Sequence, residues 1–216
     1  MAKKNFLDII KKQRASKKKE KFSGTLLDYL ELVKENPDII KLAHKRLYES
    51  IHKQGVKTLD IDSEGYRPIF NGDKLRVYDY FSSDFYGMES VTNKLLRFLK
   101  SAAHKGEESR QVLLLMGPVG AGKSALIDSV KRALENADNH YYLDGCPIRE
   151  EPLHLIPRSL RPQFEEILGV HIEGDLCPLC RHRLIEEFNG VYEDFPVKET
   201  SFSQRGRRGI SVVPPM

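Results

Sequence analysis

The feature that most constrains this chain of 216 residues is the segment 117–124, which reads Gly-Pro-Val-Gly-Ala-Gly-Lys-Ser. It fits the pattern G-x-x-x-x-G-K-[ST], in which glycines let backbone amides converge on phosphate oxygens. An apolar run at 112–116 precedes the segment, and an amphipathic segment at 124–135 follows it. A buried strand, a glycine-rich turn and a helix in this order predict a phosphate-binding loop (P-loop).

The residue types in this loop predict how a nucleotide is held. The ammonium group of Lys123 is expected on the β- and γ-phosphates, and the hydroxyl of Ser124 on Mg²⁺. The other predicted nucleotide-binding residues form the turn itself: Gly117, Pro118, Val119, Gly120, Ala121 and Gly122. The motif therefore predicts a nucleoside triphosphate bound with Mg²⁺, and it does not say how the energy is used.

Composition and cysteine content narrow the class of protein and its compartment. The chain is 40% hydrophobic and 31% charged, as is typical of a globular protein. Its longest purely apolar run, Val112–Met116, is far shorter than the ~20 residues of a membrane span. Three cysteines are too few for a disulfide framework. We therefore expect no membrane span and a cytoplasmic location.

The N-terminal segment 1–21 concentrates positive charge. It contains nine lysines and arginines against two acidic residues, and the rest of the chain is mildly acidic. Such a segment contacts anionic partners or is simply a solvated helix. No aromatic side chain interrupts the lysine-rich residues 11–21 to stack on bases, so nucleic acid is not the expected partner.

The apolar spacing predicts helices before and after the loop. Stripes at helical spacing cover 26–33, 39–51 and 91–102, and Asn36-Pro37 separates the first two. After the loop we expect a strand at 140–143, a helix at 161–168 and a short helix at 184–188. The tail has strand-like pieces. These elements predict a mainly helical N-terminal region at 1–80 and an α/β nucleotide-binding core at 81–216.

Hydrolysis requires an acid that holds Mg²⁺ at the end of a second strand. Asp144, directly after His140–Leu143, is the nearest candidate. A self-sufficient small-molecule kinase would use it in this way. The following Gly145 favours a turn instead, so we assign Asp144 no catalytic role.

Cys177-Pro178-Leu179-Cys180 has the spacing with which two thiolates hold one tetrahedral metal. The available further ligands are Cys146, His154, His171 and His182. Cys146 with His154 would complete a zinc site of three cysteines and one histidine. Buried thiols in a tight turn and a redox pair are the alternatives, and the spacing leaves all three open. In the proline-rich loop at 146–157, we expect Glu150 and Glu151 to be exposed.

Several separated blocks together resemble the PrkA family of bacterial serine protein kinases. The blocks are 113–120, 145–157, 177–181, parts of 24–44 and Phe85-Tyr86-Gly87-Met88-Glu89. They cover nearly the whole chain. Ala121 departs from the glycine that is common in relatives, which is harmless if its φ is negative.

The resemblance implies an ATPase of the AAA+ type, with a P-loop, a parallel-sheet core and a helical N-terminal region. It implies ATP and Mg²⁺ as ligands, a protein substrate or partner, and a homo-oligomer. Tyr86 and Gly87 resemble the segment that often lies beside the adenine. Family members attach a kinase-like domain after this region, and Lon-like, ATP-dependent proteolysis has been proposed for some.

The chain is short for this family, and we expect it to be a truncated member. No kinase catalytic loop and no second acidic motif are readable, so no catalytic residue is assigned. Whether the chain is itself an enzyme stays open at this point. Arg205, Arg207 and Arg208 are more readily a solvated tail than cations that act on a neighbouring subunit. The alternative function is a zinc-containing module that binds nucleic acid or protein and uses nucleotide as a structural ligand.

Overall fold

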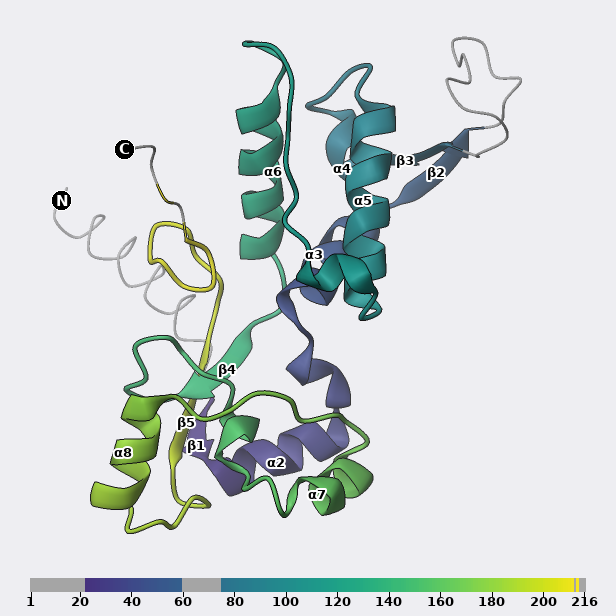
Figure 1. Ribbon diagram of the computed structural model, residues 1–216. Helices are drawn as coiled ribbons and strands as arrows, with labels where there is room; N and C mark the ends of the chain where they lie inside the picture. The colour runs from purple at the N-terminus through teal and green to yellow at the C-terminus, as the bar shows by residue number, and fades with distance from the viewer. Residues whose placement is uncertain (1–21, 60–74, 212, 214–216) are drawn as a thin grey trace, which may run out of the picture. The chain divides into compact units, whose positions relative to one another are not determined.

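The computed structural model describes residues 22–59, 75–211 and 213, which form two compact units (Figure 1). The sheet unit contains residues 22–40 and 139–200. The helical unit contains the described residues of 41–138 and 201–213. The functional division predicted at residue 80 falls inside the helical unit and stays a prediction.

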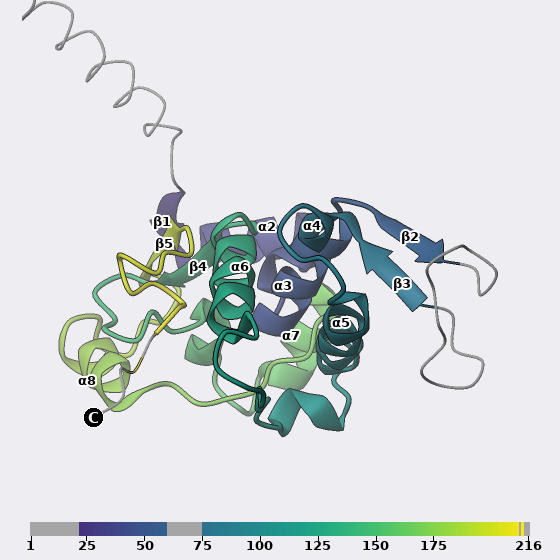
Figure 2. The ribbon, with the colours of Figure 1, turned by 90° about the horizontal axis from the view of Figure 1, so that it is seen from above.

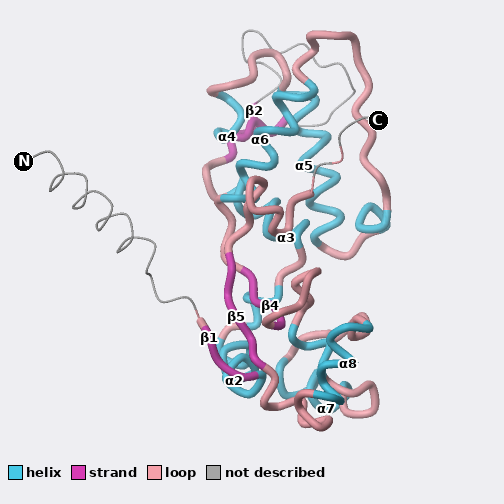
Figure 3. The backbone as a smooth tube through the Cα atoms, turned by 90° about the vertical axis from the view of Figure 1, so that its left-hand side faces the viewer, coloured by secondary structure: helices cyan, strands magenta, loops and turns pink. Residues whose placement is uncertain are grey.

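Three short strands form the sheet of the sheet unit. They are β1 (Ser23–Thr25), β4 (His140–Leu143) and β5 (Pro196–Thr200). Strand β5 lies between β1 and β4 (Figure 3), and both pairings are antiparallel. The strand predicted at 140–143 is therefore confirmed. All strand pairs among the described residues are antiparallel, so the predicted parallel core stays a prediction.

Helix α2 (Leu26–Glu35) follows β1 directly. Thr25 and Asp28 form a capping box, in which each side chain accepts from the other residue's backbone N–H. The apolar stripe predicted for this helix is buried and consists of Leu26, Tyr29, Leu30 and Val33. The helix ends before the short 3₁₀ helix η1 (Pro37–Ile40), where Asn36 Oδ1 accepts from Asp38 N at 3.1 Å.

Two further helices and a 3₁₀ turn complete the sheet unit. They are η3 (Pro152–Leu155), α7 (Arg161–Leu168) and α8 (Pro178–Glu186). Helix α7 ends at Gly169 as predicted, with φ +66°. Helix α8 begins earlier than the predicted 184, because Pro178 suits a first helical position and Cys177 acts as its N-cap. The core includes Leu143, Leu153, Ile156, Phe195 and Val197.

The helical unit packs three long helices: α3 (Ala43–His52), α5 (Glu89–Ala103) and α6 (Lys123–Glu135). Helix α3 lies between α5 and α6 (Figure 2) and contacts both. The helices predicted at 91–102 and 124–135 are therefore confirmed. The core of this unit includes Ile51, Phe81, Leu96, Leu99 and Leu126.

Smaller elements complete the helical unit. Strands β2 (Val56–Leu59) and β3 (Leu75–Tyr78) form an antiparallel hairpin. Helix α4 (Asp79–Ser82) follows β3, and the 3₁₀ helix η2 (Glu107–Arg110) follows α5. The apolar stripe expected to be continuous over 39–51 is divided between η1 and α3.

The strand predicted at 112–116 does not form among the described residues. Val112, Leu114 and Met116 are 94%, 75% and 84% exposed, and only Leu115 packs against the core of the helical unit. The prediction of a strand buried on both faces is wrong for this piece of chain. A parallel strand is buried by neighbouring strands and covering helices, and the described residues supply neither on the exposed side.

Two further expectations concern the basic N-terminal segment and membrane-spanning helices. The basic segment 1–21, with its predicted anionic contacts, lies outside the described residues. Among the helices that the structure describes, none combines the length and hydropathy needed to cross a membrane.

The packing of α2 predicts the effect of Tyr29→Phe. The Tyr29 ring is fully buried, and its hydroxyl donates to Glu151 Oε1 at 2.6 Å. The variant keeps the ring and removes this hydrogen bond, so we expect the free energy of unfolding to fall by about 1 kcal/mol. In urea unfolding, this loss of stability appears as a lower midpoint concentration, while the dependence of the free energy on urea concentration stays unchanged. Tyr86→Phe is the control, because that ring is exposed, and an equal midpoint for both variants would contradict the prediction.

Candidate functional site

The glycine-rich loop turns sharply before α6. Gly120 has φ +83° and Gly122 has φ +76°, values that a side chain makes costly. Ala121 is not among the residues with positive φ, so an alanine is accommodated at this position, where relatives commonly have glycine, without backbone strain. Helix α6 begins at Lys123, and its first free amides therefore lie directly after the turn. Loop and helix have the local form expected of a phosphate site.

The side chain of Lys123 lies back across the loop. Its Nζ donates to the carbonyl oxygens of Gly117 at 2.8 Å and Pro118 at 2.5 Å. An ammonium group has three N–H donors, so one remains for an anion. The lysine is thus at the loop and can exchange carbonyl contacts for phosphate contacts. Ser124, the predicted Mg²⁺ ligand, is exposed on the first turn of α6.

The segment predicted to lie beside the adenine is close to the end of the loop. A Cβ at Gly122 would lie 3.6 Å from the sulfur of Met88. Gly87 takes φ +69°, and the Tyr86 ring is 91% exposed. The turn at 86–88 therefore adjoins the loop, with an aromatic face open to solvent.

The phosphate loop lies on the surface of the described residues. The helical unit contains a cavity of about 650 Å³, lined mainly by residues of α5 and the β2–β3 hairpin. Its basic lining residues are Arg76, Arg97, Lys100 and His104. None of residues 117–124 lines this cavity, so it is not a nucleotide pocket formed by the loop.

The other candidates for phosphate chemistry have structural partners. Asp144 lies in the turn after β4, in the sheet unit, and pairs with Lys198 at 2.8 Å between Oδ2 and Nζ. The turn interpretation of Asp144-Gly145 agrees with this placement, since Gly145 has φ +75°. Arg208 Nε donates to the carbonyl of Ser201, which ties part of the basic tail to its own turn.

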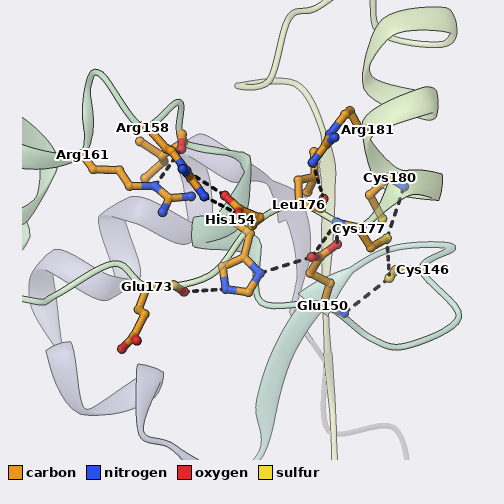
Figure 4. A network of polar contacts seen from close by, with 12 residues as sticks. Cys146, Glu150, His154, Arg158, Arg161, Glu173, Leu176, Cys177, Cys180 and Arg181 are labelled. Carbon is orange, nitrogen blue, oxygen red and sulfur yellow. Dashed lines mark hydrogen bonds and ion pairs between the residues drawn. The ribbon is translucent and has the colours of Figure 1, made fainter.

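The three cysteines come together in the sheet unit. The Sγ atoms of Cys146 and Cys177 are 4.0 Å apart, and all three thiols are free. Cys180 N–H donates to Cys177 Sγ at 3.4 Å. The fourth group among them is the carboxylate of Glu150, and the ligand atoms of the four residues all lie within 4.8 Å of one another (Figure 4).

His154 is not a member of this cluster, but it contacts Glu150, which is. Its Nδ1 contacts Glu150 Oε1 at 3.2 Å, and its Nε2 contacts the carbonyl oxygen of Glu173 at 2.9 Å (Figure 4). The histidine predicted as the fourth member of the cluster is thus a partner of Glu150. Glu150 and Glu151 were both expected to be exposed, and that expectation is wrong. Glu151 is partly buried, and the buried carboxylate of Glu150 accepts from the backbone N–H of Cys177 and contacts His154.

The surroundings of Cys177 and Cys180 disfavour the charged form of these two thiols. Burial raises the pKa of Cys177, and the nearby carboxylate of Glu150 adds to the effect. Burial also raises the pKa of Cys180, helped by the thiols of Cys146 and Cys177. Low pKa values make cysteines reactive, so the geometry gives no support to the redox alternative.

Comparison with known proteins assigns the chain first to a class and then to a family. Its class is that of the AAA domains. The sequence matches the PrkA AAA domain family over residues 24–216, and the chain belongs to this family. The family resemblance seen in the sequence is therefore confirmed.

The relatives are much longer than this chain. It is 37% identical to the ATP-dependent protease PrkA of Bacillus subtilis (strain 168), over 98% of its own length and 32% of that protein. It is 30% identical to the serine/threonine kinase YeaG of Escherichia coli (strain K12), over 89% of its own length and 30% of that protein. A shorter stretch, 35% of the chain, is 34% identical to 8% of the human mitochondrial Lon protease homolog. The chain thus spans about a third of the first two relatives. No solved structure matches it.

The contact between Gly174 and His154 predicts that substitutions at these two positions have non-additive effects on the free energy of unfolding. It takes φ +104°, and a Cβ there would lie 2.6 Å from His154 Nε2. Gly169→Ala, at φ +66° in open space, should cost about 1 kcal/mol of stability from strain alone. Gly174→Ala should cost more, because the methyl group displaces the imidazole.

A double-mutant cycle tests this interpretation. In a His154→Ala background the collision is absent, so the cost of Gly174→Ala should fall toward that of the Gly169→Ala control. Urea midpoints of the four proteins give the coupling. Strictly additive effects would mean that the ring does not occupy the space above Gly174.

Proposed function

We propose that the chain binds ATP with Mg²⁺ through residues 117–124, as the nucleotide-dependent part of a PrkA-type protein. The observation that carries the proposal is a complete phosphate-loop motif on a turn that leads directly into α6. Membership of the PrkA AAA domain family supports it. The name of the Bacillus subtilis relative, an ATP-dependent protease, points to the same nucleotide.

Each group in the loop has a distinct task in this proposal. The backbone amides of 119–122 and the first amides of α6 donate to phosphate oxygens, where the helix dipole favours negative charge. Lys123 leaves the carbonyls of Gly117 and Pro118 and adds a mobile cation. The hydroxyl of Ser124 contributes one Mg²⁺ ligand, and the ion neutralises phosphate charge. Tyr86 and Gly87 adjoin the base.

We propose further that nucleotide binding or turnover controls the activity of the longer protein. The relatives bear the names of a protease and of a serine/threonine kinase, and both activities act on proteins. A protein substrate and a homo-oligomer are therefore the proposed partners. Among the described residues, the acids that directly follow a strand are Asp79 and Asp144, and they pair with Lys57 at 2.9 Å and with Lys198 at 2.8 Å. We therefore expect nucleotide binding with little hydrolysis by this chain alone.

The exposed run at 112–116 supports the same interpretation. Its five residues are apolar, and four of their side chains are exposed: Val112, Leu113, Leu114 and Met116. We infer that the run pairs with strands supplied by the rest of the longer protein, which would fix the start of the phosphate loop. A strand that acquires neighbours on both edges would be buried as its sequence predicts.

Lys123→Ala tests the proposed ATP site. Loss of a charge-assisted contact of roughly 1.5–3 kcal/mol should weaken Mg²⁺-dependent ATP binding by about 10- to 150-fold. Calorimetric titration of the folded variants measures the affinity. Lys131→Ala is the matched control, since it removes a lysine of the same helix whose partner is Asp128 at 2.8 Å. Equal affinities for the Lys123→Ala variant and the unaltered chain would overturn the proposal.

The Asp144→Asn variant distinguishes this proposal from the alternative that the chain is a self-sufficient kinase in which Asp144 holds Mg²⁺. The Asp144 carboxylate pairs with Lys198 in the sheet unit, so its loss should leave Mg²⁺–ATP affinity unchanged within about twofold. The same titration measures it, with Lys123→Ala as the positive control. A collapse of Mg²⁺-dependent binding or turnover in Asp144→Asn would instead support the acid role.

A further inference from the structure

The thiol cluster of the sheet unit has the composition and the closeness of a metal centre. Two loops supply it: the turn after β4 carries Cys146 and Glu150, and the start of α8 carries Cys177 and Cys180. The four ligand atoms lie within 4.8 Å of one another. Three of the four residues are buried, and Cys177 is partly buried.

The separation of the sulfurs suits a tetrahedral ion. With Zn–S bonds of about 2.3 Å and tetrahedral angles, two bound sulfurs lie about 3.8 Å apart. The Sγ atoms of Cys146 and Cys177 are 4.0 Å apart in the structure. A disulfide requires the two sulfurs at about 2.05 Å, so the observed spacing is closer to that of a shared ion.

Backbone amides already point at the sulfurs. Glu150 N–H donates to Cys146 Sγ at 3.5 Å, and Cys180 N–H donates to Cys177 Sγ at 3.4 Å. The first contact depends on Arg149, which takes φ +51° and turns the chain back toward Cys146. An N–H that donates to sulfur also stabilises a metal-bound thiolate, and the charge of a bound cation would offset the cost of burying that thiolate. In each of the two loops, a backbone N–H therefore points at a cysteine sulfur of the cluster.

The carboxylate is held by a second set of contacts. Cys177 N–H lies 2.8 Å and 3.0 Å from the two oxygens of Glu150, and His154 Nδ1 lies 3.2 Å from Oε1. His154 is fixed in turn by the carbonyl of Glu173 at 2.9 Å. A buried carboxylate costs free energy unless it is paired, and a cation among the thiols would pair it. Figure 4 shows the Glu150 carboxylate between His154 and Cys177.

We propose that Cys146, Cys177, Cys180 and Glu150 bind one Zn²⁺ ion as a closed structural site, with His154 as the residue that positions Glu150. Thiolates select a soft or borderline ion, and four protein ligands leave no open position for catalysis. The three thiols bind as thiolates, so their protons pass to solvent. The ion ties the turn after β4 to the start of α8. This proposal is independent of the ATP site, which lies in the helical unit.

Metal analysis of the full 216-residue chain is the first test. Protein purified with a reductant and dialysed against zinc-free buffer should retain about one zinc per chain by mass spectrometry. X-ray absorption should give three sulfur ligands and one oxygen ligand, without the multiple scattering of a bound imidazole. Cobalt(II) added to the chelated protein should give the charge-transfer band of thiolate ligands.

Matched variants assign the fourth ligand. Glu150→Gln should lower zinc affinity by at least about 100-fold in a competition with a chromophoric chelator. Glu151→Gln, which removes the same charge one residue along, should leave zinc affinity within about twofold. His154→Gln should weaken binding by about 10- to 100-fold while the three-sulfur, one-oxygen coordination stays unchanged, as expected for a residue that orients a ligand.

Several results would overturn the proposal. A correctly folded chain with no zinc after purification and no cobalt spectrum would exclude the site. A mass lower by two hydrogens under mild reductant, with one free thiol remaining, would show a disulfide in its place. Imidazole scattering in the unaltered chain would replace Glu150 by a histidine and end its assignment as the fourth ligand. Because these readouts use the unaltered chain, they remain decisive even if a cysteine variant does not fold.

Discussion

The buried carboxylate of Glu150 is the constraint on which the sheet unit depends. A carboxylate in the interior needs hydrogen bonds that compensate for lost water. Here the backbone N–H of Cys177 and the ring of His154 provide them. The ring must also reach the Glu173 carbonyl, which is possible because Gly174 has no Cβ to block it. One buried charge thus determines the positions of three segments that are distant in the chain.

The same arrangement sets the entry angle of α8. Cys177 begins that helix with its sulfur accepting from Cys180, while its own amide is bound by Glu150. Arg183 on the helix donates to the Asp144 carbonyl at 2.6 Å and lies over the Phe195 ring at 5.1 Å. A helix of nine residues with little apolar periodicity has weak intrinsic stability. Its place is therefore maintained by these polar contacts together with the packing of Cys180 and Leu184 in the core, and an ion bound at its first turn would add to them.

Local signals in the sequence predicted much of this structure. The helix at 26–35 follows from its capping residues and apolar stripe, and the end of α7 follows from Gly169. The sharp turn before α6 could be predicted because the glycines that allow it, Gly120 and Gly122, are close together in the chain, whereas phosphate binding by this loop stays a prediction. The grouping of Cys146 with Cys177 was one of several open alternatives. Glu150 was missed, because a charged residue between prolines is normally exposed and no local pattern shows that its backbone donor, Cys177, lies 27 residues away.

The run at 112–116 shows why a strand predicted from sequence can be missing from the described fold. Its apolar content predicts a strand buried on both faces, yet burial of such a strand is a property of its neighbours. Gly117 follows the run directly, so the direction in which the loop amides point depends on how firmly 112–116 is held. Helix α6 holds the other end of the loop through Leu126, which is buried in the helical unit. One end of the glycine-rich loop is thus anchored by local packing, and in our proposal the other end is fixed by strand partners at long range. Lys123 accordingly bonds to carbonyls of its own loop, and the affinity of the site for a polyphosphate should rise when the run acquires strand neighbours.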